Sequence, residues 1–461
     1  MDDLSPQSRL SSRRSFIKQS ALAAGAVAMP ALVRAQQSDS PNSRLNLACI
    51  GVGGKGKGDV SDAARYANIV ALCDIDLAGD ASKTIAEHPN VPRYTDYRKL
   101  FDEMGSQFDA VTISTPDHSH YPIAMRALME GKHVLLQKPL ANTIWEARQL
   151  HLAARQYGVV TQMGIQGHTY EGIRLLKEWI EADAIGRVTQ ARYWTNRPIW
   201  PQGIDVQWHP AESVPDGLNW EVWKGTVPID QPYSPDLHPK KWRASWDYGC
   251  GALGDIGCHL FDHVFWALDL GYPEVVEAES FTDFDDRIAP SHSVIRYRFT
   301  RTRKGRKIKP VEFLWSDGGL KPPVPEELGE GRTLDPSFGQ LITGTKGKIY
   351  SPTAYCETLR IIPEEDMRAF KRPPKRIPRV KGGPIKEWID AIKSGTQPGA
   401  NFEYAARLTE VVLLGNLAIR LGKPIRWDAE NMKVVGQPEA DPMIRRAYRE
   451  GWEIPEITPD A

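Results

Sequence analysis

The chain has 461 residues, of which 41% are hydrophobic and 25% charged, an ordinary globular composition that excludes a disordered, collagen-like or small disulfide-stabilised protein. Basic and acidic residues number 58 each, so no overall positive charge attracts nucleic acid or an anionic membrane surface. Five scattered cysteines are too few for a disulfide framework. We therefore expect two or three domains and no nucleic-acid partner.

The first segment in chain order looks like an export signal. Residues 12–18 contain the pair Arg13-Arg14 and precede a short apolar run, 20–33, which is too short to span a membrane. This pattern is typical of a twin-arginine signal; the alternative is a chance arginine pair before an alanine-rich helix. We expect 1–35 to be removed and 36–43 to be a linker. The mature protein is then periplasmic or otherwise exported, without stable membrane insertion.

Residues 44–165 alternate short apolar strands with helices. Such alternation is typical of an α/β Rossmann domain, in which a parallel, doubly wound sheet binds ligands at the carboxyl ends of its strands. We expect strands at 45–50, 68–73, 110–114, 133–136 and 159–163, and helices at 57–66, 77–87, 97–104, 121–130 and 144–157.

Residues 166–461 have a different pattern. A helix at 171–181 and a strand at 187–195 precede an irregular stretch rich in Pro and Trp. Alternating segments then predict antiparallel strands, and two helices are expected near the end. These strands are expected at 275–281, 293–300 and 311–315, and the helices at 384–393 and 403–421. We predict an α+β domain with a large, mostly antiparallel open sheet, which binds substrate and mediates oligomerisation.

A dinucleotide site is predicted where the first strand meets the first helix. The run Gly51-Val52-Gly53-Gly54-Lys55-Gly56 gives a tight turn, close approach to a pyrophosphate, and a helix N-terminus for the phosphates. Asp74 ends the second strand, where its carboxylate can bind the ribose hydroxyls and repel a 2′-phosphate; Asp76 is an alternative. The cofactor is therefore expected to be NAD rather than NADP. The alternative is a glycine turn beside a surface aspartate, with no role in nucleotide binding.

Two further segments of the same sheet reach the cofactor. Thr115, Pro116 and His120 follow the third strand, and Gln137 and Lys138 follow the fourth, so we expect all five to contact the cofactor. A lysine at this place can donate a hydrogen bond and carry a proton beside the nicotinamide. The alternative is a surface lysine.

A glycine-rich turn opens a helix that carries Asp255 and His259 in the second domain. The two side chains share one helix face, so Asp255 can orient an imidazole that removes a hydroxyl proton. One alternative is a helix-capping aspartate with a core histidine. Another is a metal site that includes His263. We assign no metal, because hydride transfer to a nicotinamide needs none.

Together these motifs resemble the glucose–fructose oxidoreductase / inositol dehydrogenase / rhizopine-catabolism (Gfo/Idh/MocA) family. The resemblance implies oxidation or reduction of sugar and cyclitol hydroxyls, with Lys138, Asp255 and His259 as the catalytic group. One position departs from the family pattern, because Gln137 replaces the Glu of Glu-Lys-Pro. The matching positions are Gly51 to Gly56, Thr115, Pro116, His120, Lys138-Pro139, Asp255 and His259.

These residues predict an exported NAD-dependent oxidoreductase with a tightly held cofactor. Its small-molecule substrate is a sugar, cyclitol or glycoside, and family resemblance implies a homo-oligomer. One alternative is glycoside cleavage by transient oxidation and elimination, with no net redox change. Another is a carbohydrate-binding module without catalysis. The candidate substrate contacts are Gln166, His168, Trp242 and Arg243.

Overall fold

The computed structural model describes residues 44–206, 209–282 and 284–458. The expected export signal and linker, 1–43, lie outside these ranges. Within them, no helix combines the length and the apolar character needed to cross a membrane.

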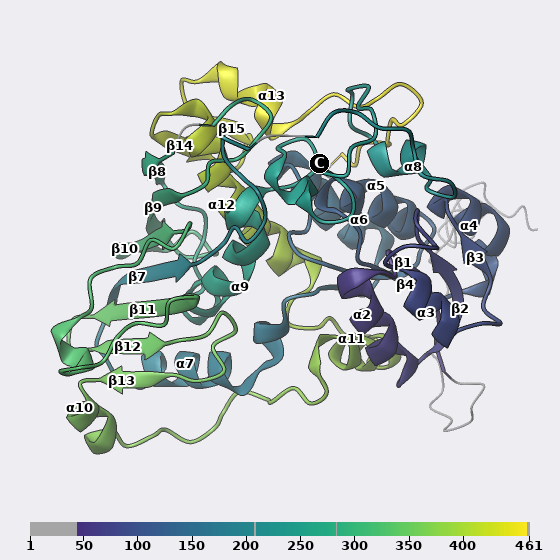
Figure 1. Cartoon of the computed structure of the whole chain (residues 1–461). Coiled ribbons are helices and arrows are strands. Elements are labelled where there is room, and N and C mark those ends of the chain that lie inside the picture. Colours follow the sequence, from purple (N-terminus) through teal and green to yellow (C-terminus); the bar gives the residue numbers. More distant parts are fainter. Residues whose placement is uncertain (1–43, 207–208, 283, 459–461) are drawn as a thin grey trace, which may run out of the picture. The chain divides into compact units, whose positions relative to one another are not determined.

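Six parallel strands form the first sheet, in the order β3-β2-β1-β4-β5-β6 (Figure 1). The predicted parallel, doubly wound sheet is therefore confirmed. The strand order reverses between β1 and β4, and sheets of this type bind ligands in the crevice at that point. The elements are β1 (Asn46–Ile50), α2 (Gly54–Ala64), β2 (Asn68–Cys73), α3 (Ser82–Glu87), β3 (Arg93–Tyr94), α4 (Tyr97–Met104), β4 (Ala110–Ile113), α5 (Asp117–Met129), β5 (His133–Leu136), α6 (Ile144–Tyr157) and β6 (Thr161–Met163).

Three helices begin at other positions than the sequence predicts. Helix α2 begins at Gly54 rather than at residue 57. Helix α3 begins at Ser82 rather than at residue 77, because the Asp76 carboxylate accepts the Gly79 amide at 2.8 Å and holds a turn there. Helix α5 begins at Asp117 rather than at residue 121, directly after Pro116. The first turn of α5 therefore stands at the carboxyl end of β4, beside the ligand crevice.

The second sheet has nine strands, in the order β13-β12-β11-β7-β10-β9-β8-β14-β15. Neighbouring strands are antiparallel except β7 and β10, which pair in parallel, so the prediction of a mostly antiparallel sheet is confirmed. The strands are β7 (Val188–Thr195), β8 (Val275–Phe281), β9 (Ser293–Arg301), β10 (Lys307–Ser316), β11 (Phe338–Gly344), β12 (Lys348–Ser351), β13 (Arg360–Ile362), β14 (Ile425–Asp428) and β15 (Lys433–Val434). The helices of this part are α7 (Glu171–Glu181), α8 (Trp220–Lys224), α9 (Gly251–Ala267), α10 (Glu364–Ala369), α11 (Gly383–Ser394), α12 (Phe402–Leu421) and α13 (Asp441–Ile444).

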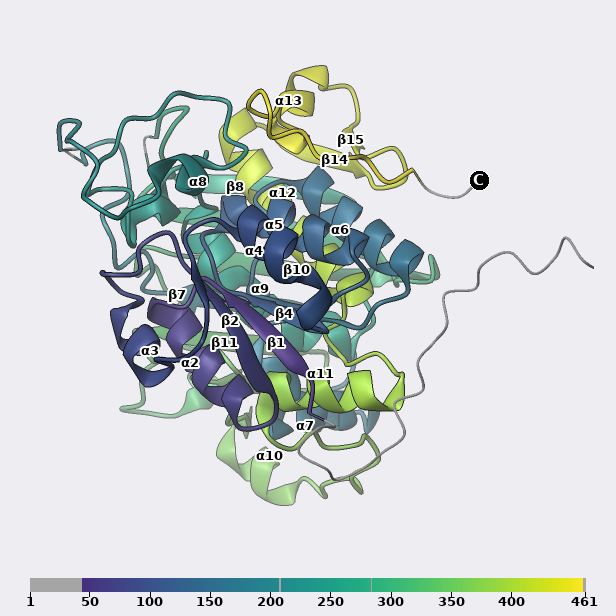
Figure 2. The ribbon, with the colours of Figure 1, turned by 90° about the vertical axis from the view of Figure 1, so that its right-hand side faces the viewer.

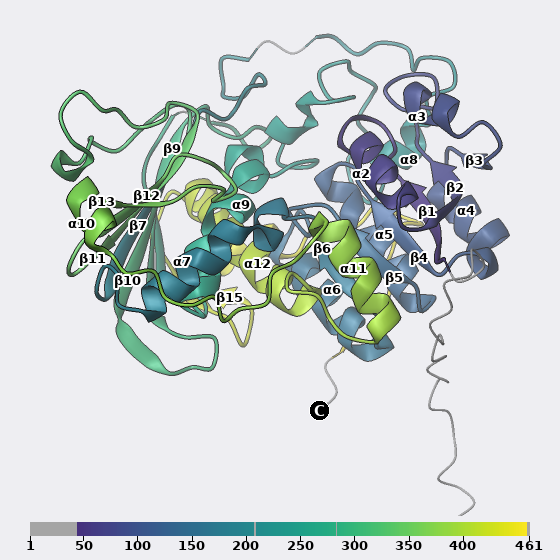
Figure 3. The ribbon, with the colours of Figure 1, turned by 90° about the horizontal axis from the view of Figure 1, so that it is seen from below.

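A layer of helices separates the two sheets (Figure 3). Helix α9 packs against both α7 and α12, and α12 also packs against α6 of the first domain. Helix α9 is buried along almost its whole length. The second domain therefore meets the Rossmann domain through helices rather than through the sheet itself.

Segments from far along the chain complete the Rossmann domain. Helix α11 lies against the first sheet and packs beside α2 (Figure 2), with Trp388 and Ile389 in the same apolar cluster as Leu47 of β1. Residues 196–206 and 209–250, which we call the covering segment, lie over the carboxyl edge of this sheet. Its Asn219, for example, donates hydrogen bonds to carbonyl oxygens that follow β2 and β3.

Candidate active site

One pocket with a volume of about 360 Å³ lies at the strand-order reversal of the first sheet. Its walls come from the glycine turn, the ends of β2, β4 and β5, helix α9 and the covering segment. Most of the residues predicted from the sequence line it: Gly51, Gly53, Gly54, Lys55, Asp74, Thr115, Pro116, Gln137, Lys138, Gln166, Trp242, Arg243, Asp255 and His259.

The glycine turn has the geometry that a dinucleotide needs. Gly51 has a φ of +75°, and a Cβ there would lie 2.7 Å from the Ser114 main chain. A Cβ on Gly56 would lie 1.8 Å from the Gly51 carbonyl oxygen. The turn therefore lets α2 start directly at the crevice, where its free amides suit phosphate. Val52 and Gly56, which the sequence also predicts as cofactor contacts, do not line the pocket; both shape the turn behind it.

Asp74 holds the glycine turn in place. Its Oδ2 accepts the amides of Val52 at 2.8 Å and Gly53 at 3.1 Å, and its Oδ1 accepts the amide of Asp76 at 3.0 Å. Asp76 in turn lies 3.1 Å from Nε2 of His238, a residue of the covering segment that the sequence did not single out. The site predicted for the ribose hydroxyls therefore contains two carboxylates and a histidine. We call the part formed by Asp74 and Asp76 the acidic edge.

Two histidines that the sequence predicts as ligand contacts have partners inside the protein. His120 is buried with its ring nitrogens 2.7 Å from the Pro139 carbonyl and 2.9 Å from the Thr115 carbonyl, so it braces two loops behind the pocket. His168 is also buried, and its Nδ1 lies 2.8 Å from Oδ1 of Asp262. Neither ring lines the pocket, because each is held by partners inside the protein.

Asp255 is surrounded by three cations. Its Oδ1 lies 3.0 Å from Lys138 Nζ and 3.4 Å from Arg243 Nε, and its Oδ2 lies 3.5 Å from Arg197 Nε. Burial by itself would raise the pKa of the Asp255 carboxyl, but these cations outweigh it and hold the pKa at about 2. Asp255 is thus ionised, and it fixes the position of the lysine amine.

His259 lies one helical turn further along α9 and lines the same pocket. Burial, together with the nearby Lys138 charge, lowers the pKa of its imidazole to about 3. The ring packs edge-on against Tyr355, with centroids 4.9 Å apart. Asp255 is not hydrogen-bonded to this imidazole, so the expectation that it orients His259 is corrected. The imidazole is therefore neutral.

The alternative of a metal site is not supported by this arrangement. Asp255 pairs with cations, and the Nδ1 of His263 lies 2.9 Å from the Gln340 amide. In the part of the chain that the structure describes, no three His, Cys, Asp or Glu side chains converge as metal ligands would.

Asp117, which the sequence reasoning missed, is a second carboxyl at the end of this pocket that holds Lys138 and Asp255. It is the first residue of α5 and is 6% exposed. Burial raises the pKa of its carboxyl to about 7, although Lys138 and Arg243 act in the opposite direction. Its place directly after the third predicted strand could have indicated a position in the pocket. However, an aspartate is also common in the first turn of a helix, where it interacts favourably with the helix dipole.

A hydrogen-bond network explains the departure at Gln137. The Gln137 side-chain amide donates to Oδ2 of the buried Asp59 at 2.9 Å, and the Ser114 hydroxyl donates to the same oxygen at 2.8 Å. Lys55 of the glycine turn forms an ion pair with the other Asp59 oxygen. Asp59 of α2 therefore places a carboxylate next to position 137, where the family pattern has a glutamate.

Among the tryptophans that the structure describes in the irregular stretch, Trp223 and Trp242 line the pocket. Trp220 stacks on Trp223 with ring centroids 4.2 Å apart, and Trp220 and Trp246 are buried. Packing therefore accounts for most of these side chains.

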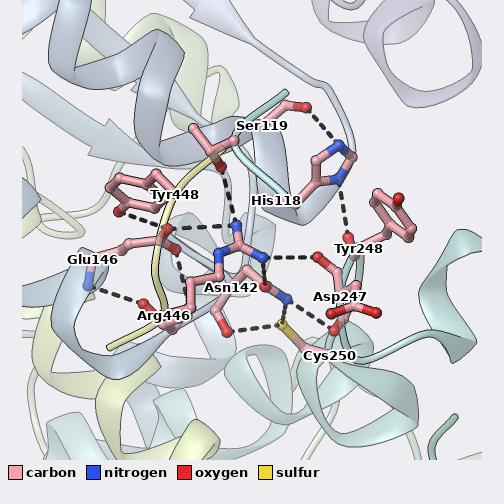
Figure 4. A network of polar contacts seen from close by, with 12 residues as sticks. His118, Ser119, Asn142, Glu146, Asp247, Tyr248, Cys250, Arg446 and Tyr448 are labelled. Carbon is pink, nitrogen blue, oxygen red and sulfur yellow. Dashed lines mark hydrogen bonds and ion pairs between the residues drawn. The ribbon is translucent and has the colours of Figure 1, made fainter. Parts of the chain in front are cut away.

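The C-terminal tail ties the covering segment to the Rossmann domain (Figure 4). Arg446 donates to the Asn142 side chain at 2.9 Å and to the Asp247 carbonyl oxygen at 2.8 Å, while Tyr448 donates to Glu146 of α6 at 3.0 Å. These contacts join three segments distant in sequence. They fasten the covering segment next to the pocket.

His118 adds a second fastening of the covering segment. Its ring nitrogens lie 2.6 Å from the Trp223 carbonyl oxygen and 3.2 Å from the Tyr248 carbonyl oxygen. The ring also packs edge-on against both aromatic side chains. The first turn of α5 is therefore bound to the cover of the pocket.

A glycine turn at the strand-order reversal and a polar pocket shared with a second domain define a dinucleotide-binding protein. Two family models match it: an oxidoreductase family with an NAD-binding Rossmann fold over residues 45–165, and that family's C-terminal α/β domain over 193–304 and 328–454. The chain therefore belongs to the Gfo/Idh/MocA oxidoreductase family.

Individual relatives match parts of the chain. Levoglucosan dehydrogenase of Pseudarthrobacter phenanthrenivorans is 27% identical over 195 residues, which is 42% of this chain and 40% of that protein. A glycosyl hydrolase family 109 protein of Shewanella sp. (strain ANA-3) is 31% identical over 160 residues, 29% of this chain and 35% of its own length. The matches therefore span less than half of these relatives.

A solved structure shares the fold. Aldose-aldose oxidoreductase from Caulobacter crescentus superimposes with a TM-score of 0.55 at 18% identity, covering 83% of this chain and 99% of that one. At this identity the likeness concerns the fold alone.

Proposed function

We propose that this protein is an exported NAD-dependent oxidoreductase that transfers hydride between a hydroxyl-bearing carbon of a sugar or cyclitol and the nicotinamide. The observation that carries the proposal is the shared pocket, in which Lys138 and the neutral His259 face the crevice beside the glycine turn. Family membership and the sugar-oxidising relative named above support it.

The residues present fit a bound dinucleotide. The glycine turn leaves room for a pyrophosphate, and the acidic edge formed by Asp74 and Asp76 suits ribose hydroxyls. Because a 2′-phosphate would meet both carboxylates, we propose NAD over NADP. When bound, the nicotinamide accepts or returns the hydride.

The chain's own residues then handle the proton and the developing charge. His259 accepts the proton of the substrate hydroxyl, since its imidazole is neutral. Lys138 donates a hydrogen bond to the same oxygen as it becomes a carbonyl. Asp255 keeps the lysine amine in position, and the pocket brings the reacting groups together.

We further propose that the cofactor stays bound between turnovers. The covering segment lies over the pocket and is fastened by Arg446 and His118. An exported enzyme meets little free NAD, so the bound cofactor has to be recycled by a second substrate or within one turnover.

The test is to purify the mature protein without added cofactor, identify the extracted nucleotide, and add a panel of sugars and cyclitols. Appearance of reduced-nicotinamide absorbance supports the proposal. Absence of any nucleotide, together with no binding of added NAD, contradicts it.

A second candidate is glycoside cleavage through transient oxidation, proton removal from the neighbouring carbon, elimination, water addition and re-reduction. Two observations favour it: the additional carboxyl near Lys138, Asp117, and the glycosyl hydrolase relative. Release of an aglycone with no net change in nicotinamide absorbance would identify this reaction.

Export and assembly complete the proposal. If the twin-arginine segment directs export, replacing Arg13 and Arg14 with lysine should leave the protein in the cytoplasmic fraction. We also propose a homo-oligomer, which size-exclusion chromatography with light scattering will test. A chain that reaches the periplasm without the arginines, or a monomer at micromolar concentration, contradicts the respective part.

A further inference from the structure

The end of the pocket that contains Lys138, Asp255 and His259, which we call the catalytic end, carries more positive than negative charge. Three cations, Lys138, Arg197 and Arg243, lie within 3.0 to 3.5 Å of the single carboxylate of Asp255. The side chains of all four residues are less than one third exposed. Asp117 is the other carboxyl at this end, and even when it is ionised one positive charge remains uncompensated.

The two arginines are positioned by aromatic rings rather than by the carboxylate. The Arg243 guanidinium lies 4.3 Å from the centroid of Trp242, and that of Arg197 lies 5.1 Å from the centroid of Phe338. Their contacts to Asp255, at 3.4 and 3.5 Å, are too long for strong charge-assisted hydrogen bonds.

Donor groups of both arginines remain unused. Each has one Nη1 hydrogen bond, from Arg243 to the Lys240 carbonyl and from Arg197 to the Asn196 side chain. Arg197 Nε is buried with no hydrogen-bond partner in the described part of the chain. Partly buried guanidinium groups lose hydration, and that loss is best offset by an anion with two oxygen atoms.

We propose that the substrate is a sugar acid, whose carboxylate binds Arg197 and Arg243 while its reacting hydroxyl lies between Lys138 and His259. This inference rests on the proposed function and names its substrate class. A carboxylate matches the planar fork of a guanidinium, and its one charge equals the excess that remains when Asp117 is ionised.

The first experiment measures binding to the NAD-loaded protein by calorimetry, using pairs that share a configuration. The pairs are glucuronate with glucose, galacturonate with galactose, and mannuronate with mannose; glucose 6-phosphate is added as a second anion. We expect at least one acid to bind about tenfold more tightly than its neutral partner, with the difference shrinking in high salt. Equal or weaker binding of the acid in every pair, no binding at all, or preferred binding of the phosphate overturns the proposal.

The second experiment uses Arg197→Gln and Arg243→Gln, with Arg192→Gln on strand β7 as a control. Both pocket variants should lose about tenfold in affinity for the acid and keep their NAD content, whereas the control should keep both. Circular dichroism spectra check folding. Loss of NAD with retained acid binding would assign the arginines to the cofactor and overturn the proposal.

The two proposals can fail separately. Reduction of the nicotinamide by neutral sugars alone would refute the proposal of a sugar-acid substrate but not the proposal of an oxidoreductase. If an acid binds in a way that depends on both arginines but no compound reduces the nicotinamide, the proposal of an oxidoreductase is refuted and the proposal of an anion site is retained.

Discussion

Lys138 Nζ contacts Asp255 twice, at 3.0 Å from the carboxylate and at 2.6 Å from the main-chain carbonyl oxygen. The lysine follows strand β5 of the Rossmann sheet, whereas the aspartate belongs to helix α9 of the second domain. The packing of the two domains against each other therefore determines where the amine points. A lysine held in this way can meet a substrate oxygen without further rearrangement.

Replacing Lys138 with methionine should remove the hydrogen bond to that oxygen while leaving most of the apolar stem. We expect kcat to fall by about 10²–10⁴-fold with bound NAD retained. Steady-state kinetics and nucleotide extraction measure the two effects. Lys99→Met, at an exposed lysine on α4, is the control. Unchanged kcat would exclude a catalytic role for the amine.

The network around Asp59 predicts that Gln137→Glu is harmful although it restores the family residue. The new carboxylate would face the buried Asp59 at the place of the present 2.9 Å hydrogen bond, and two like charges repel there. We expect lower thermal stability and weaker NAD binding. The double variant Asp59→Asn with Gln137→Glu should recover both, because the pair again has one carboxylate and one amide. Additive losses in the double variant would contradict this pairing.

Asp117 predicts how the binding of a sugar acid depends on pH. Burial raises the pKa of this carboxyl to about 7, so below pH 7 the group is neutral and above it is negative. Its ionisation adds negative charge near Arg243 and weakens the binding of an anion. We expect affinity for the acid to decline as pH rises from 6 to 8. His259, with a pKa of about 3, does not change charge in this range.

Calorimetric titrations at several pH values measure this decline, and Asp117→Asn should abolish it. The affinity of the variant should then be nearly constant between pH 6 and 8. A decline that persists in Asp117→Asn would assign the titration to another group.

The tail contacts predict that Arg446→Ala accelerates release of NAD. The variant loses hydrogen bonds to Asn142 and to the Asp247 carbonyl oxygen, which fasten the covering segment. We expect the dissociation rate of bound NAD to rise by about tenfold or more, measured by exchange into labelled NAD. Arg426→Ala, at an exposed position on β14, should not change it. If release is equally slow in both variants, the tail does not retain the cofactor.

Local patterns in the sequence predicted much of the Rossmann domain. The strands at 68–73 and 133–136 and the helix at 144–157 match the structure residue for residue. These elements depend on nearby residues: runs of apolar side chains, and the capping contacts between Thr143 and Glu146 at the start of α6. The glycine turn was visible for the same reason.

The sequence alone thus determined the nucleotide-binding turn, the strand-end residues and the helix that carries Asp255 and His259. The tertiary structure decided what each group faces. It gave Asp255 three cations in place of a histidine, placed His168 inside the protein, and brought His238 to the acidic edge near Asp74. These contacts join positions far apart in the chain, and the spacing of residues along a sequence carries no information about which distant segments meet.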